Sequence, residues 1–355
     1  MLRASYTPYT LQFRTPGGTS RGVLTEKKSW FIKVWDESTP EMFGLGECGI
    51  LAGLSCDDRP GYEQQLHEVC RNIECYQETL HDELATWPSI RFGLEMALLD
   101  LQTGGERLWF NTPFTRAEEP ITINGLVWMG RADEMAQRIS QKIEEGFRCI
   151  KMKIGAIDFD EELRLLSEIR AHFSANEMEI RVDANGAFNP VDAHEKLKQL
   201  AEFHLHSIEQ PIPAGQWEAM ARLCADTPLP IALDEELIGV WEKDRQFEML
   251  QTIQPQYIIL KPSLVGGFRA SERWIHLAEG VGAGWWVTSA LESNVGLAAI
   301  AQWTSTLGSL MLQGLGTGQL YTNNFPAPME IREGKLHHTT QAWQLKALLD
   351  TVWNN

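Results

Sequence analysis

The sequence predicts an α/β protein, a (β/α)7β modified TIM barrel preceded by a separate α+β domain. The first of two observations behind this prediction is a regular spacing of charged residues. Four of them each end a short apolar run, at successive intervals of 26, 25 and 27 residues: Asp183, Glu209, Asp234 and Lys261. Such an interval matches one strand, one helix and two connections. Strand ends of a parallel barrel meet on one face, where the active sites of such barrels lie.

The second observation is an alternation of strand-like and helix-like segments after about residue 120. Eight apolar runs are typical of strands: 121–127, 149–154, 179–185, 205–211, 231–235, 257–262, 284–290 and 311–317. Helical periods fill the seven intervals, at 132–147, 158–173, 189–203, 216–226, 241–253, 267–281 and 294–307. Eight strands and seven helices make a barrel that lacks its last helix.

The first part of the chain has a mixed pattern. Strand-like runs at 10–14 and 29–34 precede a loop rich in Gly and Asp at 44–60, and helical periods follow at 62–80 and 90–102. We therefore expect an α+β domain at 1–115 and the barrel at 116–325. Because a closed barrel has no place for another strand, the strand-like run at 329–337 predicts that residues 326–355 return to the first domain.

Composition limits the partners. The 355 residues carry a formal net charge of −17, which disfavours nucleic acid. No window approaches the ~18 apolar residues of a membrane span, so no membrane partner is expected. Six scattered cysteines without CxxC pairs fit reduced thiols in a cytoplasmic protein. The pattern leaves the oligomeric state open.

Alternation along the strands turns the charged side chains inward. In the run 150–154, Lys151 and Lys153 share one side of the strand and three apolar residues share the other. The same parity turns one carboxylate inward on each of three later strands: Asp183, Glu209 and Asp234. Three such carboxylates repel one another unless a cation lies among them, and oxygen ligands favour Mg²⁺, with Mn²⁺ as a substitute.

The lysines suit proton transfer. Near another ammonium and a metal ion, Lys153 is expected to have a pKa lowered toward the range of a general base. The alternative for each single residue is a structural role, such as a solvated loop carboxylate or a lysine–carboxylate pair inside the barrel. Spacing alone leaves this alternative open.

Seven motifs carry a family resemblance over nearly the whole chain: Lys151-x-Lys153, RVDAN at 181–185, EQP at 209–211, LDE at 233–235, LKPS at 260–263, TSRG at 19–22 and GECGILAGLS at 46–55. With these motifs the sequence resembles the enolase superfamily, in the subgroup typified by muconate lactonizing enzyme. Within that subgroup it is most similar to the o-succinylbenzoate synthase family.

The resemblance implies a capping α+β domain over the barrel. It implies Asp183, Glu209 and Asp234 as Mg²⁺ ligands, and Lys153 and Lys261 on opposite faces of the substrate, assisted by Lys151. Three further residues are expected to orient these groups from behind: Arg181, Asn185 and Glu235. A Lys base working with Mg²⁺ is a known pattern of enolase-superfamily sites.

The implied activity is the dehydration of 2-succinyl-6-hydroxy-2,4-cyclohexadiene-1-carboxylate, a small carboxylate, to 2-succinylbenzoate in menaquinone biosynthesis. Specificity is expected from the cap loops at 16–22 and 51–55 and from the last two strand ends. The candidate substrate-binding residues are Ser20, Arg21, Leu51, Ser263, Ser289, Leu291, Gly316 and Thr317.

Other members of the subgroup are alternatives. Dipeptide epimerases typically carry an Asp-x-Asp pair at the eighth strand end, and the segment 314–318 has no acid. N-succinylamino acid racemase passes that test, since its substrate carries no ammonium group to be paired. A binding protein that has lost catalysis is disfavoured, because every expected ligand and both flanking lysines are present.

Overall fold

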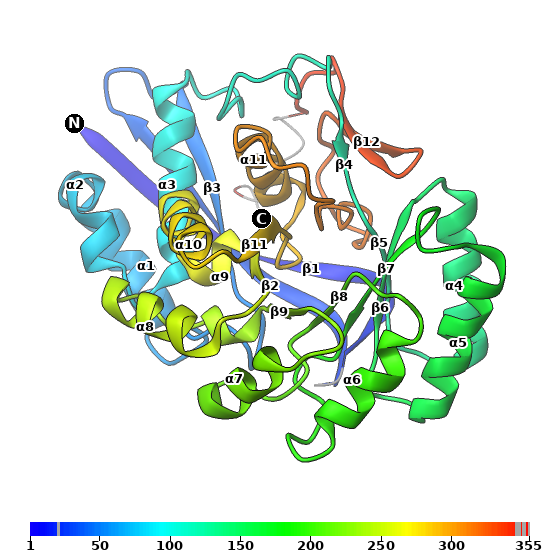
Figure 1. Cartoon of the computed structure of the whole chain (residues 1–355). Coiled ribbons are helices and arrows are strands. Elements are labelled where there is room, and N and C mark those ends of the chain that lie inside the picture. The colour runs from blue at the N-terminus through cyan, green and yellow to red at the C-terminus, as the bar shows by residue number, and fades with distance from the viewer. Residues whose placement is uncertain (20–21, 345–348, 350–352, 354–355) are drawn as a thin grey trace.

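The N-terminal cap is built on a long antiparallel hairpin. The computed structural model describes residues 1–19, 22–344, 349 and 353 (Figure 1). Its first sheet has the order β1 (Leu2–Thr19), β2 (Gly22–Asp36) and β3 (Phe43–Gly49). Helices α1 (Tyr62–Arg71), α2 (Ile73–Glu83) and α3 (Pro88–Gln102) follow. The expected loop at 16–22 is thus largely strand, and Gly18 forms a bridge to Met129 at the barrel mouth.

Strand β3 corrects a second expectation, because the Gly-rich stretch from residue 44 was expected to be a loop. Its glycines instead let helix α3 lie directly on the strand. A Cβ atom at Gly44 would lie 1.8 Å from the carbonyl oxygen of Ala97, and one at Gly46 would lie 1.8 Å from that of Gly93. Glycine here permits a close backbone approach and does not mark a turn.

The barrel strands form one parallel sheet, which has seven members within the described part of the chain. They are β5 (Gly125–Val127), β6 (Cys149–Lys153), β7 (Glu179–Asp183), β8 (Ser207–Glu209), β9 (Ile231–Leu233), β10 (Tyr257–Leu260) and β11 (Gly284–Val287). The helices around them are α4 (Ala132–Glu144), α5 (Phe159–His172), α6 (Ala193–Ala201), α7 (Trp217–Ala225), α8 (Lys243–Ile253), α9 (Pro262–Val265), α10 (Phe268–Gly280) and α11 (Asn294–Thr304).

The eighth expected strand, 311–317, is reduced to two bridges. Gln313 pairs with Ile123 and Gly314 pairs with Thr288, both in the parallel sense. The segment therefore lies between the first and last strands of the sheet and closes the barrel there.

The return of the C-terminal segment 326–355 to the first domain stays a prediction. Strands β12 (Met329–Arg332) and β13 (Lys335–His338) pair with β4 (Ile121–Thr122), next to the start of the barrel. His338 contacts Phe114, and Trp343 contacts Trp109. The domain boundaries at 115 and 325 stay a prediction.

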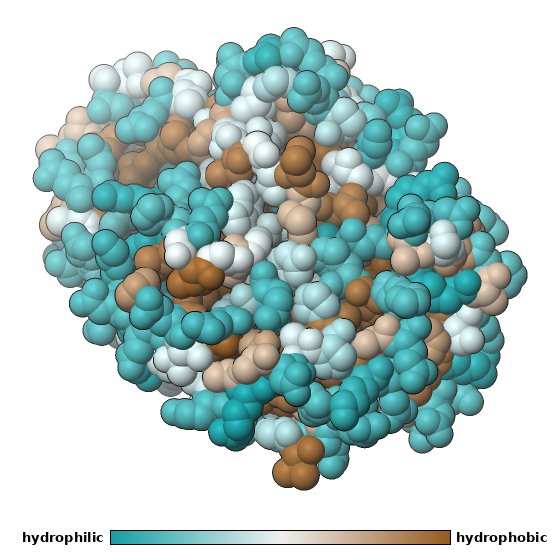
Figure 2. All heavy atoms as spheres, in the orientation of Figure 1, coloured by the Kyte–Doolittle hydropathy of each residue, from teal (hydrophilic) through white to brown (hydrophobic). Residues whose placement is uncertain are grey.

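Apolar side chains on the outward faces of the strands make the main core. Ile150, Met152, Ile180, Val182 and Ile208 are fully buried, as their strand parity predicts. Hydrophilic residues cover much of the face in Figure 2, with smaller hydrophobic patches between them. None of the helices in the described part of the chain is long and apolar enough to span a bilayer.

Candidate active site

The strand ends bring the predicted charged residues together. The sheet register places Lys153 opposite Asp183, and Asp183 opposite Glu209. Asp234 directly follows β9, and Lys261 directly follows β10. The three carboxylates and Lys151 and Lys153 are buried in the barrel mouth; Lys261 is nearly so, with 12% of its side chain exposed.

Ion pairs link all six groups. Lys151 Nζ lies 2.9 Å from Asp183 Oδ2 and also pairs with Glu209. Lys153 Nζ lies 2.6 Å from the same oxygen of Asp183. Lys261 pairs with Asp234, and its Nζ lies 3.9 Å from Glu209 Oε1. Alternating ammonium and carboxylate groups therefore fill the mouth of the barrel.

This packing shifts the pKa values of the carboxylates in different directions. Burial favours the neutral form of Asp183, but Lys151 and Lys153 outweigh it and hold the pKa well below its usual range. For Asp234, Lys261 likewise overcomes burial and lowers the pKa. Burial and then repulsion by Asp183 raise the pKa of Glu209. Glu209 is therefore the carboxylate of the three whose ionised form the neighbouring lysines do not stabilise enough to offset burial.

The neighbouring lysines are held as cations. Burial favours the neutral amine of Lys151, but Asp183 and Glu209 together raise its pKa. Asp234 and Glu209 raise the pKa of Lys261 in the same way, again against burial. The role of Lys261 in stabilising an anion stays a prediction.

Two of the three predicted supporting residues lie beside the charged groups. Asn185 Oδ1 accepts a hydrogen bond from Lys153 Nζ at 2.8 Å, and Asn185 Nδ2 donates to Glu235 Oε1 at 3.0 Å. The backbone N–H of Asn185 donates to Asp183 Oδ1 at 3.0 Å. Asn185 has φ of 45°, in the left-handed region that Asn tolerates better than most residues.

Arg181 differs from its expected role. Its guanidinium pairs with Glu179 at 2.7 Å, donates to the carbonyl of Leu312 at 2.9 Å and stacks over Trp286. Two positions before Asp183 on the same strand face, it lies one layer deeper in the barrel, because a strand advances about 6.6 Å over two residues. Its described contacts therefore stabilise the barrel interior and do not orient Asp183.

A cavity opens beside the lysines. Five predicted substrate-binding residues line it: Leu51, Ser289, Leu291, Gly316 and Thr317. The hydroxyl groups of Ser289 and Thr317 are hydrogen-bonded to each other at 2.6 Å. Ser263 does not line it, because its hydroxyl donates to Glu292 at 2.5 Å behind the wall. Ser20 and Arg21 lie outside the described residues.

Leu54, Ala290 and Gly314 also line the cavity, from segments expected to do so, whereas five lining residues lie outside the expected segments: Leu24, Asn124, Leu126, Trp128 and Thr288. A usable signal existed for three of them. Asn124, Leu126 and Trp128 alternate along the first barrel strand, so they share one face. Strand parity turns that face inward, as it does for the charged residues of the later strands.

The lining is apolar with a cationic side. Its charged members among the described residues are Lys151, Lys153 and Lys261, and none of the lining residues is acidic. Lys153 and Lys261 extend from strands separated in the sheet by β7, β8 and β9, so they flank the cavity from opposite sides. Such a site suits an apolar molecule that carries at least one carboxylate.

A divalent cation was expected among Asp183, Glu209 and Asp234. In the described part of the chain, no group of three or more His, Cys, Asp or Glu side chains is arranged as a metal site. The ammonium groups of Lys151 and Lys261 pair with these carboxylates instead. The donor set still fits a hard cation, since it consists of three buried carboxylates at neighbouring strand ends.

Comparison with known proteins agrees with this geometry. Residues 134–342 match the family of enolase C-terminal domain-like proteins. The chain is 49% identical to the o-succinylbenzoate synthase of Desulfotalea psychrophila, over 94% of this chain and 98% of that protein. The crystal structure of MenC from Desulfotalea psychrophila LSv54 matches with a TM-score of 0.84 and 45% identity, over 95% of this chain and 99% of that one.

A more distant relative is the N-succinylamino acid racemase of Thermus thermophilus. It is 30% identical over 84% of this chain and 79% of that protein. The barrel, the cap and these similarities together show that the chain belongs to the enolase superfamily, and within it to the family of o-succinylbenzoate synthases.

Proposed function

We propose that this protein is an o-succinylbenzoate synthase, a lyase that removes water from 2-succinyl-6-hydroxy-2,4-cyclohexadiene-1-carboxylate to form 2-succinylbenzoate. The identity of 49% to a synthase over almost the full length of both chains carries the proposal. The cavity supports it, because apolar side chains suit the ring and three lysines suit the carboxylates. The reaction belongs to menaquinone biosynthesis, and we propose that it takes place in the cytoplasm.

Lys153 is proposed as the base. It takes the proton from the carbon that bears the ring carboxylate, and the electron pair of that C–H bond becomes part of the ring. The hydroxyl group then leaves from the neighbouring carbon and receives a proton from the Lys153 ammonium, so that water departs and the ring becomes aromatic. Hydrogen bonds to Asp183 and Asn185 hold Lys153 Nζ in place for both steps.

Lys261 and Lys151 are proposed to stabilise negative charge. Lys261 approaches from the opposite side of the cavity, and neighbouring carboxylates raise its pKa, so it remains a cation throughout. Lys151 lines the cavity beside Lys153 and is available to the substrate carboxylate. Charges fixed in advance, in a buried site, stabilise a developing anion more than mobile water does.

Asp183, Glu209 and Asp234 are proposed to hold Mg²⁺, for which Mn²⁺ can substitute. When bound, the ion neutralises the charge that builds up on the substrate carboxylate as the α-proton leaves. The burial of all three carboxylates at neighbouring strand ends supports this assignment, since oxygen ligands suit a hard cation.

The cavity disfavours a dipeptide epimerase, because no acidic side chain among its described lining residues is available for a substrate ammonium group. N-succinylamino acid racemase remains the competing function, since lysines on both sides of the cavity can also exchange a proton between two faces.

The deciding experiment supplies the cyclohexadiene carboxylate with Mg²⁺ and follows the absorbance of 2-succinylbenzoate. We expect turnover by the wild type and none by Lys153→Ala. Incubation of N-succinyl amino acids in ²H₂O, with detection of the optical rotation and of deuterium uptake, measures racemisation in parallel. Racemisation without dehydration would replace the proposed function by the competing one.

A further inference from the structure

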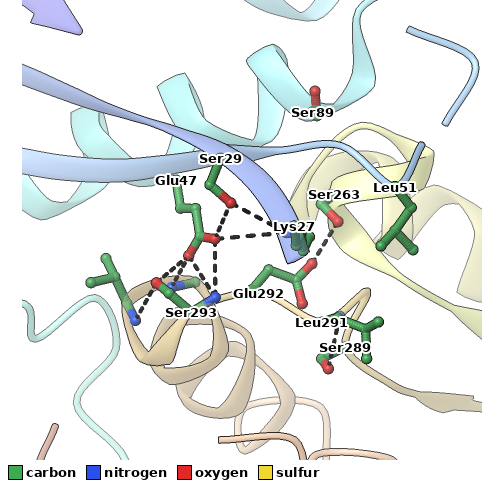
Figure 3. A network of polar contacts seen from close by, with 12 residues as sticks. Lys27, Ser29, Glu47, Leu51, Ser89, Ser263, Ser289, Leu291, Glu292 and Ser293 are labelled. Atoms are coloured by element: carbon green, nitrogen blue, oxygen red, sulfur yellow. Dashed lines mark hydrogen bonds and ion pairs between the residues drawn. The ribbon is translucent and has the colours of Figure 1, made fainter. Parts of the chain in front are cut away.

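A buried polar cluster joins the cap to the barrel behind the cavity wall (Figure 3). The cap contributes Lys27 and Ser29 from β2 and Glu47 from β3, and the barrel contributes Ser263, Glu292 and Ser293. We call these six residues the cap–barrel cluster. Each is less than 5% exposed, so each polar group depends on partners within the protein.

Glu47 lies at the centre of the cluster and caps a barrel helix. Its carboxylate accepts hydrogen bonds from the backbone N–H of Ser293, at 3.0 and 3.1 Å, and from that of Gly296 at 3.1 Å. The Ser293 hydroxyl donates to it at 2.5 Å. These groups form the N-terminal end of α11, where free N–H groups and the helix dipole favour a negative charge. One side chain of the cap thus completes a helix some 246 positions later in the chain.

Two residues of β2 also contact the Glu47 carboxylate, and glycines beside them leave room for it. Lys27 Nζ lies 3.8 Å from Glu47 Oε1, and Ser29 donates to the same oxygen at 2.8 Å. A Cβ atom at Gly296 would lie 2.9 Å from Glu47 Oε2, and one at Gly49 would lie 2.4 Å from Lys27 Nζ. Glycines on both sides therefore leave room for the ion pair.

The cluster is continuous with three wall residues of the cavity. Leu291 directly precedes Glu292, Lys261 lies two positions before Ser263, and Leu51 lies two positions after Gly49. Figure 3 shows Leu51, Leu291 and Ser289 on the strands and loops that the cluster joins. The wall segment 288–291 thus ends two residues before Ser293, whose backbone N–H donates to Glu47.

We propose that Glu47 is a positioning residue, which acts through Ser293 to hold the wall segment 288–291 and thereby sets the affinity for substrate. The expected change in substrate affinity rests on the proposed function, because it is measured with the substrate of that function. Glu47 touches none of the lysines that carry the chemistry, so its loss affects binding of substrate and transition state alike.

The chain contains a matched control. Glu95 of α3 accepts hydrogen bonds from the backbone N–H groups of Phe268 and Arg269, at 2.6 and 3.1 Å, and so caps α10 in the same manner. A Cβ atom at Gly267 would lie 2.0 Å from Glu95 Oε2. Neither Glu95 nor the first turn of α10 lines the cavity.

The test compares Glu47→Gln with Glu95→Gln in the full chain, by thermal melting, steady-state kinetics and hydrogen exchange. Both variants are expected to melt at a lower temperature. Loss of the Glu47 carboxylate is expected to raise KM about tenfold while kcat changes less than about threefold, and Glu95→Gln to leave KM within about twofold. Hydrogen exchange of the backbone amides at residues 288–297 is expected to be faster than in the wild type in Glu47→Gln, and unchanged in Glu95→Gln.

Equal KM changes in the two variants would show that Glu47 is merely structural, and so would accelerated exchange without a change in KM. If Glu47→Gln does not fold, Ser293→Ala removes one of the contacts, keeps both charges and is expected to give a smaller KM increase. If the wild type does not turn over the diene, the proposed function fails; the exchange comparison then decides alone, and unchanged exchange at 288–297 overturns the proposal.

Discussion

Lys153 Nζ lies 2.8 Å from Asn185 Oδ1, and the same amide group donates to Glu235 from its nitrogen. Asn185→Gly removes this bridge and keeps the backbone, because glycine accepts the positive φ at that position. We expect kcat/KM to fall by about tenfold to a hundredfold, as for groups that orient catalytic ligands. Steady-state kinetics measures this change in kcat/KM. Asn189→Gly, at an exposed position, serves as the control, and an equal loss there would contradict the role of Asn185.

Removal of divalent cations is expected to abolish turnover, and Mg²⁺ or Mn²⁺ to restore it. A ligand that binds only the folded state also raises the melting temperature. We therefore expect Mg²⁺ to stabilise the wild type in a thermal melt, and Glu209→Gln to lose that response. Glu236→Gln is the control, because this buried carboxylate faces Gln210 and Gly215. A Mg²⁺ response that survives in Glu209→Gln would remove Glu209 from the metal site.

Asp57 is expected to make stability depend on pH. Burial raises the pKa of this carboxyl to about 6, although Ser89 donates two hydrogen bonds to it. The pKa of Asp57 is thus higher in the folded state, about 6, than in the unfolded state, about 4. Such a group contributes stability that is fully present below pH 4 and is lost as the pH rises through about 6. The difference in unfolding free energy between Asp57→Asn and wild type should therefore grow by about 2 kcal/mol from pH 4 to pH 7.

Urea unfolding at several pH values measures this difference. Asp58→Asn, at the exposed neighbouring position, is the control and is expected to follow the wild type. A constant difference for Asp57→Asn across this range would mean that folding leaves the pKa of Asp57 unchanged.

The contact between β3 and α3 is expected to tolerate no side chain at Gly46. A methyl group there would lie 1.8 Å from the carbonyl oxygen of Gly93, so strand and helix must separate. We expect Gly46→Ala to destabilise the protein by about 3 kcal/mol or more, at the upper end for overpacking. Gly280→Ala, at an open helical position, should change stability by less than about 0.5 kcal/mol. Thermal melts compare the two, and similar melting temperatures would show that the helix shifts freely.

The inward-facing carboxylates could be predicted from the sequence because two independent patterns indicate the same residues, namely the spacing between strands and the alternation along each strand. Spacing placed Asp183, Glu209 and Asp234 on successive strands, and parity turned them to one side. Both rules follow from backbone geometry, which tertiary packing changes little. The ion pairs among these groups and the lysines agree with that prediction, while their catalytic roles stay proposals.

Features that depend on packing were harder to predict. The Gly-rich strand β3 resembles a loop until the position of α3 is known, since the glycines serve a contact between distant segments. Ser263 was expected in the pocket, but its hydroxyl turns toward Glu292, whose burial no local pattern reveals. Asn124 and Trp128 line the cavity from a strand with little charge to mark it.

The sources of the lining residues have a consequence for how such proteins diversify. Among the described residues, the cationic groups at the cavity come from the ends of barrel strands, whereas Leu24, Leu51 and Leu54 come from the cap. Part of the selectivity is therefore encoded in a stretch of the gene that contains none of the lysines proposed for catalysis. Mutations in the cap can retune which acid is accepted while the proton-transfer apparatus is inherited intact.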